Sequence, residues 1–318
     1  MVDDVKKFDK RELFAIIIMA LLFVVVYFIS LLITGTFQSE GMQAFEDPDN
    51  PINIVYILFI MLIFTFIILM IAKFWKKQLI QVIILGAIGY TSAYVFYPIF
   101  NLFLSDFYSL VIPIIGELSL SIILSILIAL LLIVVLYKYP EWYVIDICGV
   151  IIGAGAIAIF GISLGILLVI ILLICLAIYD AISVYKTKHM IDLADTVMDL
   201  KLPVLLVVPK IRNYSLINET KRLKEKIEEN SERDAFFMGL GDIVMPGILV
   251  VSTFNNLSNP IPIVLSVIIG TLIGFIFLMV FVIKGKPQAG LPFLCGGAIL
   301  GYLISNLIFF GEIRGLFF

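Results

Sequence analysis

Charged residues are scarce in this chain of 318 residues, because only 14% are Asp, Glu, Lys or Arg. A soluble globular domain carries about 25% charged residues, so a water-soluble protein is excluded. The hydrophobic content of 62% and the mean hydropathy of +1.18 indicate a multi-pass protein of the cell membrane. The lipid bilayer is therefore an expected partner, and nucleic acid is not.

Histidine and cysteine are also rare. His189 is the only histidine, which argues against a His-rich metal site and against a Ser/His/Asp triad chosen among several histidines. The three cysteines, Cys148, Cys175 and Cys295, all lie in apolar runs. Their odd number and their spacing fit neither a disulfide framework nor a zinc site. We therefore expect chemistry without a metal or another cofactor.

Nine runs of apolar residues are long enough to cross a bilayer, which takes roughly 20 residues of helix. The first run is too long for the apolar part of a signal peptide, so we expect it to be a helix. The runs predict an all-α membrane fold with nine spans, at 13–34, 52–72, 79–99, 110–136, 142–161, 163–185, 236–254, 261–283 and 288–310.

The distribution of basic residues predicts the orientation of these spans. Lys and Arg accumulate on the cytoplasmic side of membrane proteins. If the N-terminus is cytoplasmic, 20 of the 21 Lys and Arg residues fall on that side, and only Arg314 does not. Merging or splitting one span would reverse the side of every later loop, so the pattern also supports the count. We expect a cytoplasmic N-terminus and an extracellular C-terminus.

The predicted spans divide the chain into helices one to six in 1–185, a cytoplasmic loop in 186–235, and helices seven to nine in 236–318. In the loop, the run Val204–Val208 lies between two prolines and is rich in valine. This favours a strand or a surface-embedded segment, and a strand there could pair with an extended peptide. The segment 218–234 is dense in charge and is expected to be a solvated, partly flexible linker.

Two carboxyl groups lie inside apolar spans, where a charge is costly. Asp180 precedes Lys186 by six residues, and Asp242 follows Asp234 by eight. At ~1.5 Å per residue of helix, both lie on the order of 10 Å inside the cytoplasmic edge. The sixth and seventh spans run in opposite directions. Neighbouring helices can therefore bring the two carboxyl groups face to face as an aspartyl pair.

The residues around Asp242 allow close approach of another segment. Gly239 and Gly241 remove side chains on both sides of the carboxyl, so a helix or an extended substrate can come near the backbone. Pro246 has no N–H to donate to the Asp242 carbonyl, which loosens the helix at this turn. Pro292, near the start of the ninth span, frees another backbone carbonyl at the same depth.

Other polar and small residues inside the spans are assigned to packing. Asp146, the third intramembrane carboxyl, is expected near the headgroup boundary with access to water, although it could also join the aspartyl pair. Glycines four residues apart are typical of closely packed membrane helices. Such pairs occur at Gly149–Gly153, Gly270–Gly274 and Gly297–Gly301.

Three motifs occur in order along the chain: Tyr179-Asp180, Gly239-Leu240-Gly241-Asp242 and Leu291-Pro292. They resemble the YD, GxGD and PAL signatures on helices six, seven and nine of the presenilin family of intramembrane aspartyl proteases. The likeness continues through 181–185 and 198–203, which are similar to archaeal presenilin homologues. The third motif departs from the family pattern, because Ala289-Gly290 stands where the family has Pro-Ala.

The resemblance implies a presenilin-like fold in which Asp180 and Asp242 are the catalytic pair. It also implies that the substrates are proteins with membrane-spanning helices and that no cofactor is needed. The residues implied to contact the substrate or to shape the site are Tyr179, Gly239, Leu240, Gly241, Gly290, Leu291 and Pro292.

The expected reaction is peptide hydrolysis by two carboxyl groups that share a proton, one as general base and one as general acid. Three alternatives remain at this point. Prepilin and preflagellin peptidases also carry GxGD, but they lack the Tyr-Asp motif and the long loop. A proton-coupled transporter could use the same aspartates, although no internal repeat is visible. A scaffold could use them only to join helices. Accessory subunits are not evident, and a homo-oligomer is compatible with the sequence.

Overall fold

The fold is given by a computed structural model of the chain. It describes residues 10–74, 77–104, 110–112, 116–118, 120–187, 205–211, 214–216, 234–283 and 288–315.

The described residues form nine α-helices, and each predicted span overlaps one of them. Seven helices are long and apolar enough to cross a membrane, whereas the apolar part of α2 is shorter and α9 has 17 residues. The predicted all-α membrane fold is confirmed at this level. The helices are α1 (Lys10–Ser39), α2 (Ile52–Phe74), α3 (Lys77–Leu104), α4 (Leu120–Lys138), α5 (Trp142–Ser163), α6 (Ile166–Ile182), α9 (Leu240–Asn256), α10 (Ile261–Ile283) and α11 (Leu291–Phe310).

The predicted helix at 110–136 is wrong in its first part. Strands β1 (Leu110–Ile112) and β2 (Gly116–Leu118) form an antiparallel hairpin, and α4 begins only at Leu120. Ile112 precedes Pro113, and the residue before a proline avoids the helical conformation. Pro113 itself lies outside the described residues.

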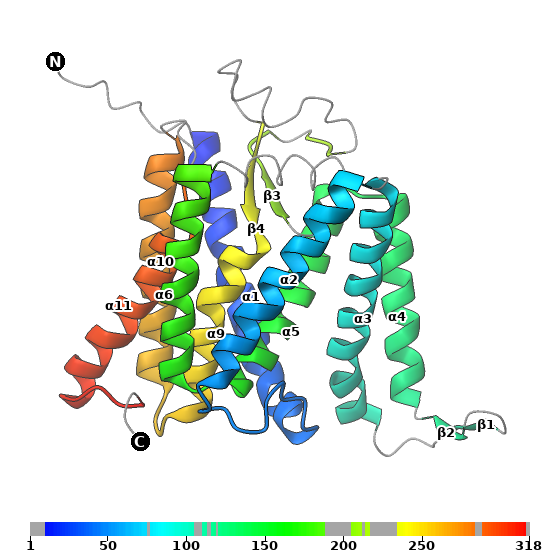
Figure 1. Ribbon diagram of the computed structural model, residues 1–318, viewed down its shortest axis with the longest axis horizontal. Helices are drawn as coiled ribbons and strands as arrows, with labels where there is room; N and C mark the ends of the chain where they lie inside the picture. The colour runs from blue at the N-terminus through cyan, green and yellow to red at the C-terminus, as the bar shows by residue number, and fades with distance from the viewer. Residues whose placement is uncertain are drawn as a thin grey trace.

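The predicted helix at 236–254 is also wrong at its start. Strand β4 (Ala235–Gly239) pairs antiparallel with β3 (Leu205–Pro209), so the strand predicted at 204–208 is confirmed. A strand rises about 3.3 Å per residue and a helix about 1.5 Å, so β4 carries the chain farther before α9 starts. Consequently, α9 begins part-way along α6 and α10 (Figure 1). The charged segment at 218–233 lies outside the described residues.

The helices form two groups that share α5. On one side α3 and α4 lie next to each other, on the other lie α6, α10 and α11, and α1, α5 and α9 lie between them (Figure 1). The main apolar core joins α1, α5, α6, α9, α10 and α11. A smaller cluster joins α3, α4 and α5 to β3 and β4. Both clusters contain residues of α5, β3 and β4, so the strand pair packs against the main core directly as well as through α5.

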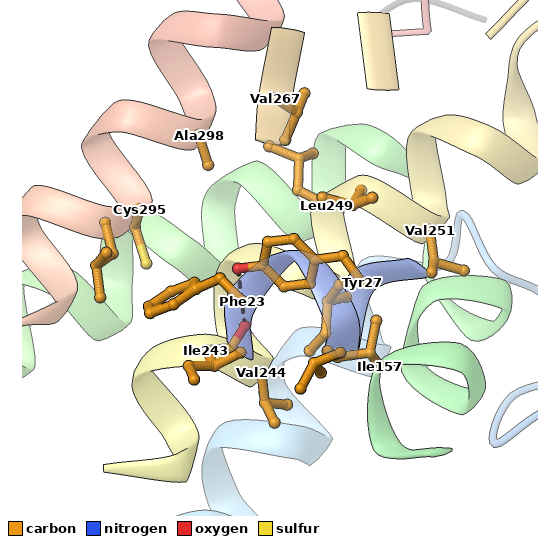
Figure 2. Close-up of a cluster of buried hydrophobic side chains, with 14 of the residues drawn as sticks. Phe23, Tyr27, Ile157, Ile243, Val244, Leu249, Val251, Val267, Cys295 and Ala298 are labelled. Atoms are coloured by element: carbon orange, nitrogen blue, oxygen red, sulfur yellow. Dashed lines mark hydrogen bonds between the residues drawn. The ribbon is translucent and has the colours of Figure 1, made fainter. Parts of the chain in front are cut away.

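Tyr27 of α1 holds the first part of α9. Its buried hydroxyl donates to the carbonyl oxygen of Ile243 at 3.1 Å, and Figure 2 shows the ring packed among apolar side chains of several helices. A Cβ at Gly247 would approach Tyr27 to 2.7 Å and Ile157 of α5 to 2.5 Å. Thus α1 and α5 fix α9 directly after Asp242.

Helices α10 and α11 are in backbone contact. A Cβ on Gly270 would overlap the carbonyl oxygen of Gly297, and one on Gly274 would overlap that of Phe293. The close packing predicted from the glycine spacing is confirmed for this helix pair. It holds the N-terminal turn of α11 in one place.

Candidate active site

Asp180 lies near the C-terminal end of α6, and only 3% of the residue is exposed. Its Oδ2 accepts a hydrogen bond from the backbone N–H of Leu291 at 3.1 Å. Leu291 is the first residue of α11, and the first N–H groups of a helix have no partner within the helix. The start of α11 therefore supplies a backbone donor and the positive end of a helix dipole to Asp180.

Asp242 lies in the first turn of α9, three residues after Gly239, which ends β4 and caps the helix. The carboxyl interacts with the backbone of Gly239, as an acidic side chain at this position commonly does with a helix cap. Unlike Asp180, Asp242 is only partly buried. The transition from strand to helix thus turns this carboxyl back toward its own backbone.

The two carboxyl groups meet at the Gly290–Leu291 dipeptide. Leu291 donates to Asp180, and a Cβ added at Gly290 would lie 2.9–3.1 Å from the three carboxyl atoms of Asp242. The two groups are also close enough to interact electrostatically. The predicted face-to-face arrangement is therefore present, and the N-terminal turn of α11 forms its third side.

A pair of neighbouring carboxyl groups can share one proton, because two like charges this close do not both persist. One member can then take a proton from a water molecule while the other donates to a carbonyl oxygen. Within the described residues, no group of three or more His, Cys, Asp or Glu side chains could hold a metal ion. The arrangement supports acid–base chemistry by the pair.

The other residues predicted to contact the substrate differ from one another in exposure. Leu240 is partly buried, and its Cδ1 would lie 3.2 Å from a Cβ on Gly153 of α5, so it packs inward. Gly241 is exposed, and a Cβ there would meet nothing within 4 Å. Tyr179 is 52% exposed on α6. Gly241 and Tyr179 are thus open to an incoming molecule, whereas Leu240 is a packing residue.

Pro292 occupies the first turn of α11, where a missing N–H costs nothing. The carbonyl expected to be freed by this proline belongs to Gln288, which lies before the helix and would have had no helical partner in any case. The physical role of Pro292 is therefore to fix the start of α11, and with it the position of the Leu291 N–H.

Sequence reasoning missed one contact near the site. The hydroxyl of Tyr185, in the π-helical turn η1 (Ser183–Thr187) after α6, donates to Oε1 of Gln288 at 2.7 Å. The contact joins the segment after Asp180 to the segment before Gly290. Nothing in the local pattern of either segment indicates this contact, because it depends on how the helices pack.

Asp146 of α5 is not the water-exposed headgroup residue that was expected. It is 6% exposed, and its Oδ1 accepts a hydrogen bond from the backbone N–H of Val207 in β3 at 2.8 Å. Asp146 thus binds a strand, and its carboxyl covers the outer edge of β3 at Val207.

A family model described as "Signal-peptide peptidase, presenilin aspartyl protease" matches residues 19–311. The chain belongs to this family. Members of the family share the aspartyl chemistry expected from the three motifs, so the protein is an aspartic protease and a multi-pass membrane protein. A comparison with curated proteins gives no match.

Two solved structures of presenilin family intramembrane aspartate proteases, in the C222 and P2 space groups, resemble this fold. The first is 34% identical with a TM-score of 0.66, and the match covers 92% of this chain and 99% of that chain. The second is 35% identical with a TM-score of 0.65, covering 91% of this chain and 96% of that chain. The protein is thus an intramembrane aspartyl protease, and neither the prepilin-type peptidase nor the transporter is favoured.

Proposed function

We propose that Asp180 and Asp242 are the catalytic pair of this protease and that it cleaves membrane-spanning helices of protein substrates. The observation that carries the proposal is the contact of both carboxyl groups with Gly290 and Leu291. This contact joins three segments, from α6, α9 and α11, that carry the three sequence motifs. An aspartyl pair formed in this way can act on a peptide placed beside it.

In the proposed reaction the pair holds one proton between its two carboxyl groups. The ionised member removes a proton from water, and the neutral member donates a hydrogen bond to the scissile carbonyl. The backbone N–H groups of Leu291 and Gly290 hold the Asp180 carboxyl in place for the reaction. The proton then passes to the departing amine, and the pair returns to its starting state.

A substrate helix must unwind before cleavage, because all its backbone groups are bonded within the helix. The unwound segment needs new backbone partners. Val207 and Phe237 are opposite each other, and Val207 directs its N–H away from β4 toward Asp146. Phe237 therefore directs its own backbone groups to the outer edge of β4. We propose that the substrate pairs with this edge of β4, rather than with β3, and lies over Gly241.

We also propose nine spans with a cytoplasmic N-terminus and an extracellular C-terminus. In this arrangement 1–185 and 236–318 form the helical body, and 186–235 is a cytoplasmic loop. The distribution of Lys and Arg supports it. The site then opens toward the cytoplasmic half of the membrane, where β3 and β4 lie.

The proposal predicts that Asp180→Asn and Asp242→Asn each abolish cleavage, because neither amide can carry the shared proton. Purified protein would be incubated with single-span substrates, and products would be identified by mass spectrometry. A transition-state inhibitor of aspartyl proteases should block the wild-type reaction. Retained cleavage in either variant would exclude the pair.

The same preparations separate catalysis from the alternatives. Both variants should keep the melting temperature of the wild-type protein, which distinguishes a catalytic pair from a scaffold. Solute uptake into proteoliposomes driven by a pH gradient, without proteolysis, would instead identify a transporter. Cleavage only after a short basic leader segment would identify a prepilin-type peptidase.

A further inference from the structure

Asp146 is a buried carboxyl that the proposed reaction does not use. It lies one turn into α5. Among the described residues, its hydrogen-bond donor is the Val207 N–H, at 2.8 Å. Ionisable groups inside a membrane protein are costly and usually have a function. The question is what this carboxyl contributes by binding a strand.

The geometry of the strand pair shows which edge Asp146 binds. The N–H of Lys210 donates to the carbonyl of Asp234, so Lys210 faces β4. Backbone groups along a strand alternate in direction, so Val207 faces away from β4. Asp146 therefore binds the outer edge of β3 and accepts the Val207 N–H that would otherwise need another strand as its hydrogen-bond partner. A carboxylate at a strand edge is a strong acceptor for such an N–H.

The same face of α5 also receives the catalytic motif. Asp146, Gly149 and Gly153 lie on one side of the helix. A Cβ on Gly149 would lie 2.8 Å from Cδ2 of Leu206 in β3 and 3.7 Å from Cδ1 of Leu240. We call the surface formed by Asp146, Gly149 and Gly153 the α5 seat. It holds β3 by a hydrogen bond and receives Leu206 and Leu240 in the space left by the glycines.

The segment that follows β3 has its own attachments. Lys210, after β3, forms an ion pair with Glu12 of α1 at 3.0 Å and lies 4.4 Å from the ring centroid of Phe236. Glu141, before α5, accepts from the Ser215 hydroxyl at 2.7 Å and from the Leu216 N–H at 3.1 Å. These contacts lie at the margin, whereas Asp146 binds the middle of β3.

We propose that Asp146 is a positioning residue for Asp242, an inference that rests on the proposed function. Asp146 fixes Val207, Val207 is opposite Phe237, and β4 continues through Gly239 into the turn that carries Asp242. Without the hydrogen bond, β3 can shift on the α5 seat and β4 shifts with it. The edge of β4 proposed to pair with the substrate and the carboxyl of Asp242 are then displaced together.

This role differs from that of a third proton carrier. A positioning residue needs only an acceptor oxygen of the right reach, which the amide oxygen of asparagine also supplies. A proton carrier needs a group that ionises, which asparagine lacks. The comparison of Asp146→Asn with Asp146→Leu, two side chains of similar size, therefore separates the two roles.

The experiment measures kcat and KM for a single-span substrate, together with hydrogen–deuterium exchange of the 205–208 amides. We expect Asp146→Leu to lower kcat by about a hundredfold, since a small misplacement of a catalytic group costs this much. KM should rise as well, because the β4 edge proposed to bind the substrate moves with Asp242. The 205–208 amides should exchange faster, and Asp146→Asn should keep most of the wild-type kcat and protection. Ser125→Ala is the matched control, because Ser125 is buried in α4 and donates only within that helix.

Each outcome is decisive. Full kcat in Asp146→Leu, or unchanged exchange at 205–208, would overturn the positioning role, and a loss in Asp146→Asn equal to that in Asp146→Leu would show a proton carrier instead. If Asp146→Leu does not fold, Asp146→Ser replaces it, because the shorter hydroxyl does not reach Val207. Wild-type protein without proteolysis would contradict the proposed function, whereas the exchange experiment would still test the contact with β3.

Discussion

At the scale of single residues, Gly290 explains the departure of the third motif from the family pattern. Its backbone has helical dihedral angles, so conformation alone does not require glycine. The requirement comes from Asp242, whose carboxyl atoms lie 2.9–3.1 Å from the position that a Cβ would occupy. In this chain the start of α11 lies too close to the carboxyl for alanine to fit without a shift.

We therefore predict that Gly290→Ala lowers kcat while the protein stays folded. The added methyl group must push the Asp242 carboxyl away from Asp180 or move the start of α11. Kinetics with a single-span substrate and thermal unfolding in detergent would measure the two effects. Gly296→Ala, in the same helix, is the control, because a Cβ there meets nothing within 4 Å. Equal activity of the two variants would show that the contact with Gly290 is unimportant.

At the scale of elements, α9 is held at its start by helices that carry no motif. Tyr27 of α1 donates to Ile243, one residue after Asp242, and Pro246 removes the hydrogen bond that the Asp242 carbonyl would otherwise accept. The first turns of α9 therefore depend on contacts with α1 and α5 more than an ordinary helix does. Thus α9 is weakened within the helix by Pro246 and is held by contacts with α1 and α5.

This support predicts that Tyr27→Phe destabilises the protein by about 1 kcal/mol, the usual net contribution of one buried hydrogen bond. The ring packing among Phe23 and its neighbours is kept, so only the hydroxyl is tested. Unfolding in mixed micelles would give the free energy. Tyr56→Phe, at a residue that is 55% exposed, should change it little. A similar loss in both variants would contradict the role of the Ile243 contact.

Much of this architecture could be predicted from the sequence, but of the four strands only β3 was expected. Hydropathy located the nine helices of the described residues because each lies in an apolar run, although only seven are long and apolar enough to cross a membrane. The segment 236–238, with two phenylalanines and a methionine, has the same hydropathy as the start of a span, so β4 could not be distinguished. Its partner β3 is distant in sequence, and local patterns carry no information on such pairing.

The site was likewise predictable in part. The depth of Asp180 and Asp242 along their spans was enough to pair them. The N–H of Leu291 was not predictable, because its direction depends on the residue at which α11 begins. The prediction for Asp146 was wrong because its acceptor oxygen binds the edge of β3, and the sequence does not show where that strand packs.

At the scale of the whole molecule, the ends of the helical bundle differ. α1 begins at the end where β3 and β4 lie, and α11 ends at the opposite end (Figure 1). The proposed orientation, with the two termini on opposite sides of the membrane, requires this arrangement. Many apolar side chains on α2 face outward, such as Val55 and Phe66, which are 67% and 68% exposed. Such surfaces fit contact with lipid.

The proposed orientation predicts which positions a membrane-impermeant thiol reagent can reach in intact cells. In a chain with Cys175→Ser, Glu46→Cys should react, because Glu46 is exposed between α1 and α2. Lys138→Cys, exposed at the end of α4, should react only after permeabilisation. Cys148 and Cys295 are buried and should stay unlabelled. The reverse pattern would invert the orientation.

The contact of one dipeptide with both carboxyl groups means that the two proposed catalytic groups share one support, besides the contacts that hold each of them separately. Glycines lock α11 to α10, so these two helices shift as one body, and any shift changes the surroundings of both carboxyl groups together. A molecule that wedges against the far end of this helix pair would therefore reduce turnover without competing with substrate. An inhibitor of this kind would not need to reach the aspartyl pair.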